Sequence, residues 1–368
     1  MKIGVDVNSL LPPITGIGRY LYEVLTRMIQ MGGEWILYAT GSIYNEKEFL
    51  EKKNVKLVKL TIPKLLPKIF FVQCLVPILI KKNGLDVFWS PTHRLPLWGN
   101  PTIRYCMTIH DLVYLQVPET MHPVNRKIEE LFFAPSVRRA NVIACVSSST
   151  KADLLSNFSE LIDKASVTRL GHSLASNESV TWTSDLKKNN YILFVGTIEP
   201  RKNIERLLHA YSLLSVEVKR RYPLIVVGKE GWGNINLHSL VNKYDLKDCV
   251  VVKGYVTDFE LFLLYRNAKL LALPSLYEGF GLPIAEAQAF GVPALASNLS
   301  SMPEVVGGAG RVVDPFDVIA IRNGLNTLLT DETLWERCSE NALEQSQLFS
   351  WKQCAEKTFS LLVGKSLR

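Results

Sequence analysis

The sequence has few cysteines and no long apolar run. Its cysteines contain no Cys-x-x-Cys pair, which favours a reducing compartment over a disulfide framework. The longest apolar stretch, residues 69–80, contains Pro77 and is shorter than the about 20 residues that span a bilayer. Polar residues interrupt the N-terminal MKIGVDVNSLLPP, so it is not typical of a signal peptide. We therefore expect a cytoplasmic protein without a membrane span.

Several catalytic signatures are also missing. The histidines and cysteines form no cluster with the spacing of a zinc site. VGKEGWG lacks the order of a P-loop, and no Gly-x-Ser-x-Gly elbow occurs. Gly16 and Gly18 do not complete a Gly-x-Gly-x-x-Gly fingerprint, and no acidic residue ends a second strand about 20 residues later. These absences disfavour a zinc enzyme, a P-loop nucleotidase, an acyl hydrolase and a nicotinamide enzyme.

The composition is that of a globular protein with a basic first half. The chain has 368 residues, of which 47% are hydrophobic and 21% charged, and this length favours two domains. Residues 1–180 contain 21 Lys plus Arg against 15 Asp plus Glu, which is most of the net charge of +7. Such an excess suits an anionic membrane surface or a phosphorylated ligand. No basic and aromatic strip accompanies the charge, so we do not expect nucleic-acid binding.

Short apolar runs that end in polar or glycine turns alternate with segments of helical period. This pattern predicts an α/β fold with two doubly wound parallel sheets in tandem. The expected strands of the first sheet are residues 2–7, 34–40, 55–62, 86–91, 104–111 and 141–149. Those of the second are residues 191–197, 223–229, 249–256, 269–275, 292–297 and 310–315.

A polar segment without periodicity, residues 171–190, is predicted to link the two domains. We expect an N-terminal domain over residues 1–175 and a C-terminal domain over residues 176–349. Residues 350–368 have the apolar spacing of a helix, which can dock on either domain and so can cross back to the first one.

Ligands of open α/β sheets bind beyond the carboxyl ends of the strands, so the residues after each strand matter most. Arg201 and Lys202 follow the strand that ends at Gly196, and Asn203 is a plausible N-cap for the next helix. Cations at a helix start are unfavourable unless an anion binds there. The pair therefore predicts a diphosphate site, since Arg holds phosphate oxygens bidentately and Lys adds a point charge. The alternative is a solvated basic pair.

A second pattern is SLYEGFGLPIAEAQAFGVPALAS, residues 275–297, in which seven residues separate Glu278 from Glu286. Gly279 and Gly281 permit a tight turn whose amides approach a phosphate or sugar closely. Pro283 suits the first helical position, and Glu286 is expected in the first helical turn, where an acid is stabilising without any ligand. That explanation does not cover Glu278.

In the first half, Gly16 and Gly18 open a helix whose first amides can meet a phosphate, although the turn can equally be only a turn. His110 ends a strand, and it is either an interior side chain or a polar group of the site. His93 and Arg94 follow another strand and either border the same cleft or lie on a surface loop.

Together FVGTIEPRKN, GYV, the Glu-x7-Glu segment, GIGRY and TIHDL resemble family-4 retaining glycosyltransferases of the GT-B architecture, over nearly the whole chain. The resemblance implies two Rossmann-like domains that face a cleft holding a nucleotide sugar, with an acceptor domain over residues 1–175 and a nucleotide-sugar-binding domain over residues 176–349. It also implies site residues. Arg201 and Lys202 hold the diphosphate, helped by the amides around Gly16 and Gly18. Glu286 binds the ribose, and His110 and Glu278 face the transferred sugar. The predicted catalytic residues are therefore His110, Glu278, Arg201 and Lys202. The remaining donor-binding positions are Gly196, Val256, Gly279, Phe280, Gly281 and Leu282.

The same resemblance, to bacterial O-antigen mannosyl- and rhamnosyltransferases, implies transfer of a hexose with retention from a nucleotide sugar to a lipid-diphosphate-linked glycan. GDP-mannose is the favoured donor, and GDP-rhamnose, UDP-glucose and UDP-N-acetylglucosamine are the alternatives. We expect no cofactor and no metal, and either a cytoplasmic location or peripheral contact with the inner membrane. An epimerase or hydrolase of the same architecture, and a sugar-nucleotide sensor without catalysis, are the rival hypotheses.

Overall fold

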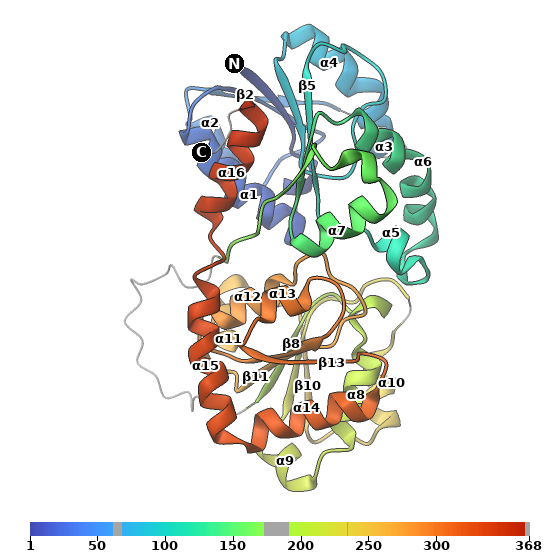
Figure 1. The fold of residues 1–368 in the computed structure, drawn as a ribbon, viewed down its shortest axis with the longest axis vertical. Helices are drawn as coiled ribbons and strands as arrows, with labels where there is room; N and C mark the ends of the chain where they lie inside the picture. Colours follow the sequence, from blue (N-terminus) through green and yellow to red (C-terminus); the bar gives the residue numbers. More distant parts are fainter. Residues whose placement is uncertain (62–67, 173–190, 234, 365–368) are drawn as a thin grey trace. The chain divides into compact units, whose positions relative to one another are not determined.

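A computed structural model of the protein describes residues 1–61, 68–172, 191–233 and 235–364. Its contacts divide the chain into two compact units, each built around its own parallel sheet (Figure 1). Unit 1 comprises Met1–Leu112, Val124–Leu170 and the segment that begins at Ser350. Unit 2 comprises Val113–Pro123 and the segment from Gly171 to Phe349. The predicted boundary at residues 175 and 176 and most of the predicted linker lie outside the described residues.

Within the described residues, unit 1 contains a seven-stranded parallel sheet of order β3-β2-β1-β4-β5-β6-β7. Its strands are β1 (Lys2–Asp6), β2 (Glu34–Ala39), β3 (Val55–Lys59), β4 (Val87–Ser90), β5 (Arg104–Ile109), β6 (Val142–Cys145) and β7 (Ala165–Val167). The helices are η1 (Asn8–Leu10), α1 (Gly16–Gln30), α2 (Glu46–Leu50), α3 (Lys68–Phe70), the π-helix η2 (Phe71–Leu75), α4 (Val76–Asn83), α6 (Pro123–Arg139), α7 (Ser148–Asn157), η4 (Ser159–Leu161) and α16 (Trp351–Val363).

The described part of unit 2 contains a six-stranded parallel sheet of order β10-β9-β8-β11-β12-β13. Its strands are β8 (Ile192–Val195), β9 (Leu224–Val227), β10 (Val250–Gly254), β11 (Leu270–Leu273), β12 (Ala294–Ser297) and β13 (Gly310–Val313). The helices are α5 (Val113–Gln116), η3 (Pro118–Thr120), η6 (Pro200–Lys202), α8 (Ile204–Ser212), α9 (Val216–Arg221), α10 (Leu237–Lys243), α11 (Asp258–Asn267), α12 (Leu282–Gln288), α13 (Met302–Val306), α14 (Val318–Thr330) and α15 (Glu332–Ser346).

The central strands explain why the apolar runs of the sequence are continuous and not alternating. Every residue of β4, β6, β11 and β12 is buried, as expected for parallel strands covered by helices on both faces. In each sheet the strand order reverses direction once, between β1 and β4 in unit 1 and between β8 and β11 in unit 2. Doubly wound sheets bind ligands beyond the carboxyl ends of the strands at this reversal. In each unit a ligand site is therefore expected beyond the two strands at this reversal.

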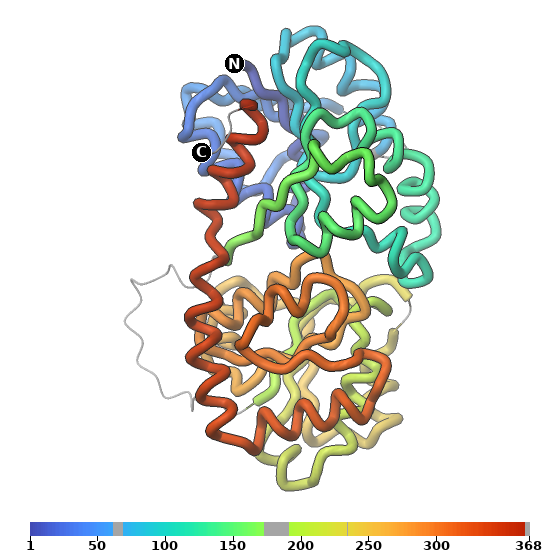
Figure 2. Tube along the Cα trace, in the orientation of Figure 1, coloured from blue at the N-terminus to red at the C-terminus, as the bar shows by residue number. Residues whose placement is uncertain are grey.

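The last helix belongs to unit 1 by its contacts. Figure 2 follows the chain from α15 of unit 2 into α16, which packs beside α1 and also touches β4 and β6. The side chains of Trp351, Cys354, Ala355 and Leu362 on α16 are buried, and they follow the helical spacing read from the sequence. Arg104 of β5 donates a hydrogen bond to the carbonyl of Leu361. The helix thus completes the packing of a sheet that begins more than 300 residues earlier.

The two sheets confirm the predicted α/β class and all twelve predicted strands, but β7 was missed. Its three residues, Ala165–Val167, are too few to show a periodicity. The apolar segment 69–80 forms α3, the π-helix η2 and α4, with Phe71, Val72 and Ile80 buried. No helix in the described part of the chain combines the length and apolar character needed to cross a membrane.

Candidate functional site

The predicted site residues of unit 2 gather at the reversal of its strand order. Arg201 and Lys202 lie in the turn that follows β8, and Glu278 lies in the turn that follows β11. These strands are hydrogen-bonded neighbours, with Leu270 beside Ile192 and Leu271 beside Leu193. The amide of Leu276 also donates to the carbonyl of Arg201 at 2.8 Å, so the two turns are joined directly. Residues that are 76 or 77 positions apart in the sequence thus become one cluster.

Glu278 is the centre of this cluster. Its Oε2 accepts a hydrogen bond from Arg201 Nη1 at 2.8 Å, and its Oε1 accepts from Lys202 Nζ and from Ser275 Oγ. Arg201 Nη2 also donates to Glu199 Oε1 at 2.6 Å. Two cations and two carboxylates therefore balance each other before any ligand binds. Glu278 and Lys202 are only 7% and 8% exposed, which makes this a buried ion-pair network.

The network keeps the Glu278 carboxyl ionised. Burial by itself raises the pKa of Glu278, but the ion pairs with Lys202 and Arg201 outweigh burial and lower this pKa to about 2. An ammonium has three donors and Glu278 accepts one of them, so Lys202 can also bind an anion. The charges of the cluster balance, and a carboxylate holds the ammonium of Lys202 in a fixed place with donors that remain for an anion. This arrangement suits a diphosphate whose charge grows during bond cleavage.

Asn203 occupies the predicted N-cap position of α8, but its side chain holds the neighbouring loops together instead of capping the helix. It has the left-handed backbone conformation, with φ of 58°, and its side chain makes no capping hydrogen bond. Instead its Nδ2 donates to the carbonyls of Pro274 and Pro315 at 2.9 and 2.7 Å. The sequence predicted the cap position correctly, whereas the contacts of this side chain are with residues distant in the sequence. The side chain ties the turn after β8 to the turns after β11 and β13.

The turn of residues 279–282 brings its backbone, and not the Phe280 side chain, to the site. Phe280 is 3% exposed, and its ring packs edge to face on Phe349 with ring centroids 5.4 Å apart. Gly281 has φ of +96°, a conformation that side chains disfavour, and it directly precedes Leu282 at the start of α12. The predicted role of this turn, in which main-chain amides contact the ligand, remains a prediction.

Glu286 is buried inside α12 and has a protein partner. Tyr265 Oη of α11 donates to Glu286 Oε2 at 2.8 Å, and Glu286 is 5% exposed. Our expectation that Glu286 lies in the first helical turn was wrong, because α12 begins at Leu282 and its first turn contains no acid. Stabilisation of a helix start therefore does not explain this residue. Its predicted ribose contact remains untested.

The other two predicted donor-binding positions of unit 2 also follow strands. Gly196 directly follows β8, and its amide donates to Val227 O at 2.9 Å. Val256 is half-buried between β10 and α11, next to Thr257, which caps α11 in a capping box with Glu260. The neighbouring Tyr255 is 75% exposed. The structure thus places Val256 in a short turn whose direction is fixed by the following cap.

His110 follows β5 in unit 1 and is buried. Its Nε2 lies 2.9 Å from the carbonyl of Pro91, and because a carbonyl only accepts, Nε2 carries the proton. Burial first, and His93 second, lower the pKa of His110 to about 4. The ring is therefore neutral at physiological pH, with Nδ1 as an acceptor. Tyr20 packs edge to face against it, with ring centroids 4.7 Å apart.

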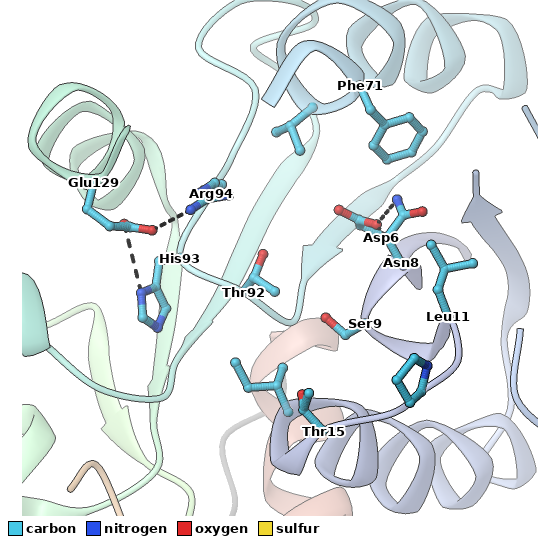
Figure 3. A pocket seen from close by; sticks show the side chains of 13 residues that line it. Asp6, Asn8, Ser9, Leu11, Thr15, Phe71, Thr92, His93, Arg94 and Glu129 are labelled. Atoms are coloured by element: carbon cyan, nitrogen blue, oxygen red, sulfur yellow. Dashed lines mark hydrogen bonds and ion pairs between the residues drawn. The ribbon is translucent and has the colours of Figure 1, made fainter. Parts of the chain in front are cut away.

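His93 lies beside His110, with ring centroids 6.3 Å apart. Its Nε2 accepts the backbone N–H of His110 at 3.1 Å, so its own proton is on Nδ1. That Nδ1 lies 4.0 Å from Oε2 of Glu129 on α6. Glu129 Oε1 in turn accepts from Arg94 Nη2 at 2.7 Å (Figure 3). His93, Glu129 and Arg94 therefore hold the backbone at His110 in place.

Gly16 and Gly18 stand at the start of α1, as predicted. Thr15, the residue before the helix, makes no side-chain capping hydrogen bond. Gly18 is buried, and a Cβ there would lie 2.5 Å from the carbonyl oxygen of Ser9, so packing alone requires glycine at this position. Gly16 is exposed. The predicted phosphate contact by these amides remains a prediction.

Sequence reasoning missed the residues that support the predicted ones. Glu199 and Ser275 lie within the quoted segments but were not singled out, and Ser300, Tyr265 and Glu129 lie outside them. Ser300 Oγ accepts the amide of Glu278 at 3.0 Å from the turn after β12. Among the described residues, no group of three or more His, Cys, Asp or Glu side chains is arranged to hold a metal ion.

Comparisons with known proteins agree with this architecture. Residues 14–169 match the sequence model of Glycosyltransferase Family 4, and residues 180–345 match that of Glycosyl transferases group 1. The chain is similar to the O-antigen chain mannosyltransferase B of Escherichia coli, with 33% identity over 98% of this chain and 99% of that protein. It is 37% identical to the serotype-specific mannosyltransferase WbdA of Escherichia coli over 72% of this chain but 34% of that protein.

The fold is also found among solved structures. Anabaena HepE, in a crystal structure in complex with UDP and glucose, matches 99% of this chain and 100% of its own with a TM-score of 0.76 and 19% identity. At that identity the likeness concerns the fold alone. The two family models match the two halves of the chain one after the other. The O-antigen chain mannosyltransferase B aligns with the chain almost from end to end. The chain therefore belongs to the family-4 glycosyltransferases of GT-B architecture, and it is a hexosyltransferase.

Proposed function

We propose that the protein is a retaining mannosyltransferase that moves mannose from GDP-mannose to a lipid-linked glycan in the biosynthesis of O-antigen or another surface polysaccharide. The observation that carries this proposal is the buried cluster of Arg201, Lys202 and Glu278 at the reversal point of the unit 2 sheet. Relatives named mannosyltransferases support the choice of sugar.

The proposed chemistry follows from the charges of the cluster. The bond between the anomeric carbon and the diphosphate oxygen breaks, and its electron pair moves to the leaving diphosphate. Arg201 and Lys202 stabilise that growing negative charge, and Glu278 holds both cations in place beforehand. A positioned charge in a water-poor site is worth several kcal/mol of transition-state stabilisation, on the order of 3 kcal/mol for one donor.

Retention is proposed to arise by attack on the face from which the diphosphate departs. The acceptor hydroxyl forms the new bond to the anomeric carbon and passes its proton to the leaving phosphate oxygen. Retaining glycosidases instead use two carboxylates about 5 to 5.5 Å apart, one of them a nucleophile. In this chain Glu278 is tied to two cations and Glu286 to Tyr265. Neither carboxylate is proposed as a nucleophile.

No metal ion is proposed for this reaction, because Arg201 and Lys202 supply the positive charge that a metal would otherwise bring. His110 is proposed to contact the transferred sugar. As a neutral ring whose Nε2 proton is held by Pro91, it can accept a hydrogen bond from a sugar hydroxyl through Nδ1. Glu286 is proposed to bind the ribose of the donor.

The acceptor and the location are part of the same proposal. The basic first half of the chain suits a lipid-diphosphate-linked glycan at the cytoplasmic face of the inner membrane, with peripheral contact through its charged surface. Sedimentation with vesicles that contain anionic lipids, compared with neutral vesicles, tests this contact. Equal sedimentation with both would contradict it.

The transfer itself is tested with purified protein, one sugar nucleotide at a time, and lipid-linked glycan extracted from a bacterium that makes the surface polysaccharide. We expect mannose transfer from GDP-mannose and little transfer from UDP-glucose, UDP-N-acetylglucosamine or GDP-rhamnose. Transfer from one of those donors instead would replace the donor and keep the reaction class. Donor turnover without acceptor would favour the epimerase or hydrolase hypothesis, and nucleotide binding without any turnover would favour a sensor.

A further inference from the structure

The second carboxylate of the unit 2 cluster, Glu199, has no part in the chemistry proposed above. Its Oε1 accepts a hydrogen bond from Arg201 Nη2 at 2.6 Å. Arg201 Nη1 donates to Glu278 Oε2 and to the carbonyl of Tyr277, both at 2.8 Å. The guanidinium therefore lies between two carboxylates. At each of its terminal nitrogens a phosphate oxygen must compete with a carboxylate that is already bound.

The two carboxylates are held with very different strength. Glu278 accepts from three side chains, those of Arg201, Lys202 and Ser275, and its own side chain is 9% exposed. Among the described residues, the carboxylate of Glu199 has one donor, Arg201, and its side chain is 19% exposed. Water can replace the hydrogen bond of a carboxylate that it reaches, whereas breaking a buried ion pair leaves a charge without a partner. Glu199 is therefore the carboxylate that an incoming phosphate displaces.

The backbone at Glu199 is fixed, so the displacement concerns its side chain. The amide of Ile198 donates to the carbonyl of Lys229 at 2.9 Å, and the amide of Gly231 donates to the carbonyl of Ile198 at 3.0 Å. The carbonyl of Glu199 itself accepts from the amide of Lys202 at 3.0 Å. A side chain on such an anchored backbone returns to the same place when the anion leaves.

The charges give this exchange a direction. Arg201 and Lys202 are balanced by Glu199 and Glu278 while the site is empty. A diphosphate that binds there is repelled by the nearby carboxylate of Glu199 and also has to replace it on Arg201. Both effects weaken the complex with the nucleotide. Weaker binding means faster dissociation, because affinity differences within one site are found mostly in the dissociation rate.

We propose that Glu199 is a displaceable internal ligand of Arg201. It leaves the guanidinium when the donor diphosphate binds, and it re-forms the ion pair as the nucleoside diphosphate product departs, which speeds product release. The inference rests on the proposed function in that it takes the anion at Arg201 to be a nucleotide diphosphate. Glu199 is a positioning residue, since it acts through Arg201 and not by contact with the substrate.

Glu199→Gln tests this exchange because it removes the charge and keeps the shape and an acceptor oxygen. We expect its Kd for GDP to fall about tenfold and GDP dissociation to slow by a similar factor, the effect of one charged hydrogen bond. A merely structural role predicts unchanged or weaker binding instead. The control is Glu205→Gln, which removes an exposed carboxylate of the same unit that pairs with Lys243 at 2.8 Å. It should leave both quantities unchanged.

Two further measurements locate the effect at Arg201 and the phosphates. The change in GDP affinity caused by Glu199→Gln should disappear in the Arg201→Ala background, as a double-mutant cycle requires for a pair that acts together. Affinity for guanosine, which has no phosphate, should be the same in Glu199→Gln and the wild type. Glu199→Ala also removes the competing carboxylate, so it should lower the Kd for GDP as well and serves as the second test if Glu199→Gln does not fold.

Isothermal titration calorimetry and stopped-flow dissociation with GDP, UDP and inorganic pyrophosphate separate this inference from the proposed function. Unchanged or weaker GDP binding in folded Glu199→Gln, or tighter binding that persists without Arg201 or occurs in Glu205→Gln, would overturn the inference while mannose transfer stands. Binding of UDP in place of GDP, tightened by Glu199→Gln, would support the inference and replace the proposed donor. Binding of none of the three anions to the wild type would overturn both.

Discussion

Glu278 and Lys202 form a buried ion pair across two neighbouring strands of unit 2, and Arg201 binds the second oxygen of the same carboxylate. Burying an isolated carboxylate is unfavourable, so the cations stabilise Glu278 as much as Glu278 orients them. The cluster is therefore a single unit, and the first predictions follow from it.

Loss of the Glu278 charge should destabilise the protein and remove an acid-sensitive component of its stability. Glu278→Gln leaves two cations without their buried partner, which costs about 3 to 5 kcal/mol at neutral pH. The folded-state pKa of Glu278 is lowered to about 2 from 4.5, so its contribution, on the order of 3 kcal/mol, is present above pH 4.5 and is lost as the pH falls toward 2. Chemical denaturation of both proteins from pH 7 to pH 2.5 measures this.

The control for this prediction is Glu336→Gln, an exposed carboxylate on α15. It should leave the free energy of unfolding unchanged at every pH. If the wild type and Glu278→Gln lose stability in parallel below pH 4.5, another group is responsible for the acid sensitivity.

Replacement of Arg201 or Lys202 by alanine should weaken diphosphate binding and leave the fold intact. Each loses at least one charged hydrogen bond to phosphate, so we expect the Kd for GDP to rise about tenfold or more. Isothermal titration calorimetry with GDP gives the Kd, and circular dichroism reports the fold. Lys243→Ala, on the surface of α10, is the control. Affinity equal to that of the wild type in both variants would refute the assignment.

Glu286 should contribute to binding only when the ribose hydroxyls are present. We expect the wild type to bind GDP about tenfold more tightly than 2′,3′-dideoxy-GDP, the effect of one charged hydrogen bond. In Glu286→Gln this preference should largely disappear. Tyr265→Phe keeps the Glu286 carboxylate but removes the Tyr265 hydroxyl that donates to it, so it should retain the preference. Equal loss of affinity for both nucleotides in Glu286→Gln would indicate a purely structural role.

His110 should stay neutral over the physiological range. Its folded-state pKa is lowered to about 4, so between pH 6.5 and pH 4 the unfolded chain binds a proton that the folded protein does not. Stability attributable to His110 is therefore present above pH 6.5 and is lost as the pH falls toward 4. His110→Gln should flatten this part of the stability profile, whereas His238→Gln, on an exposed position of α10, should not. NMR titration that shows His110 protonating near pH 6.5 would contradict the assignment.

Removal of metal ions should leave transfer unchanged. We expect full activity in EDTA, because the positive charge at the diphosphate is proposed to come from Arg201 and Lys202. Initial rates before and after EDTA treatment, and after re-addition of Mg²⁺ or Mn²⁺, check this point. A complete loss that Mg²⁺ or Mn²⁺ restores would show that the charge neutralisation was assigned to the wrong groups.

Local patterns were enough to predict the strands of both sheets and the helical character of the α16 segment, although not the unit on which α16 packs. Apolar runs, turn glycines and helical spacing are properties of neighbouring residues, so they can be read without knowing the fold. β7 was not predicted, because its three residues are too few to show a periodicity. The contacts of Asn203 with Pro274 and Pro315, and that of Glu286 with Tyr265, were not predicted because these partners are distant in the sequence.

The sequence by itself determined the α/β class, the family and the identity of the residues after each strand. Only the tertiary structure decided which of these residues meet. Strand order sets that outcome: β8 and β11 become neighbours although β9 and β10 lie between them in the chain, and this brings Lys202 to Glu278. In the same way the neighbours β1 and β4 bring Asp6 and Thr92 to one pocket, where Glu129 joins them from α6. These contacts matter for stability, because a charged side chain is stable in a protein interior only when it has a partner.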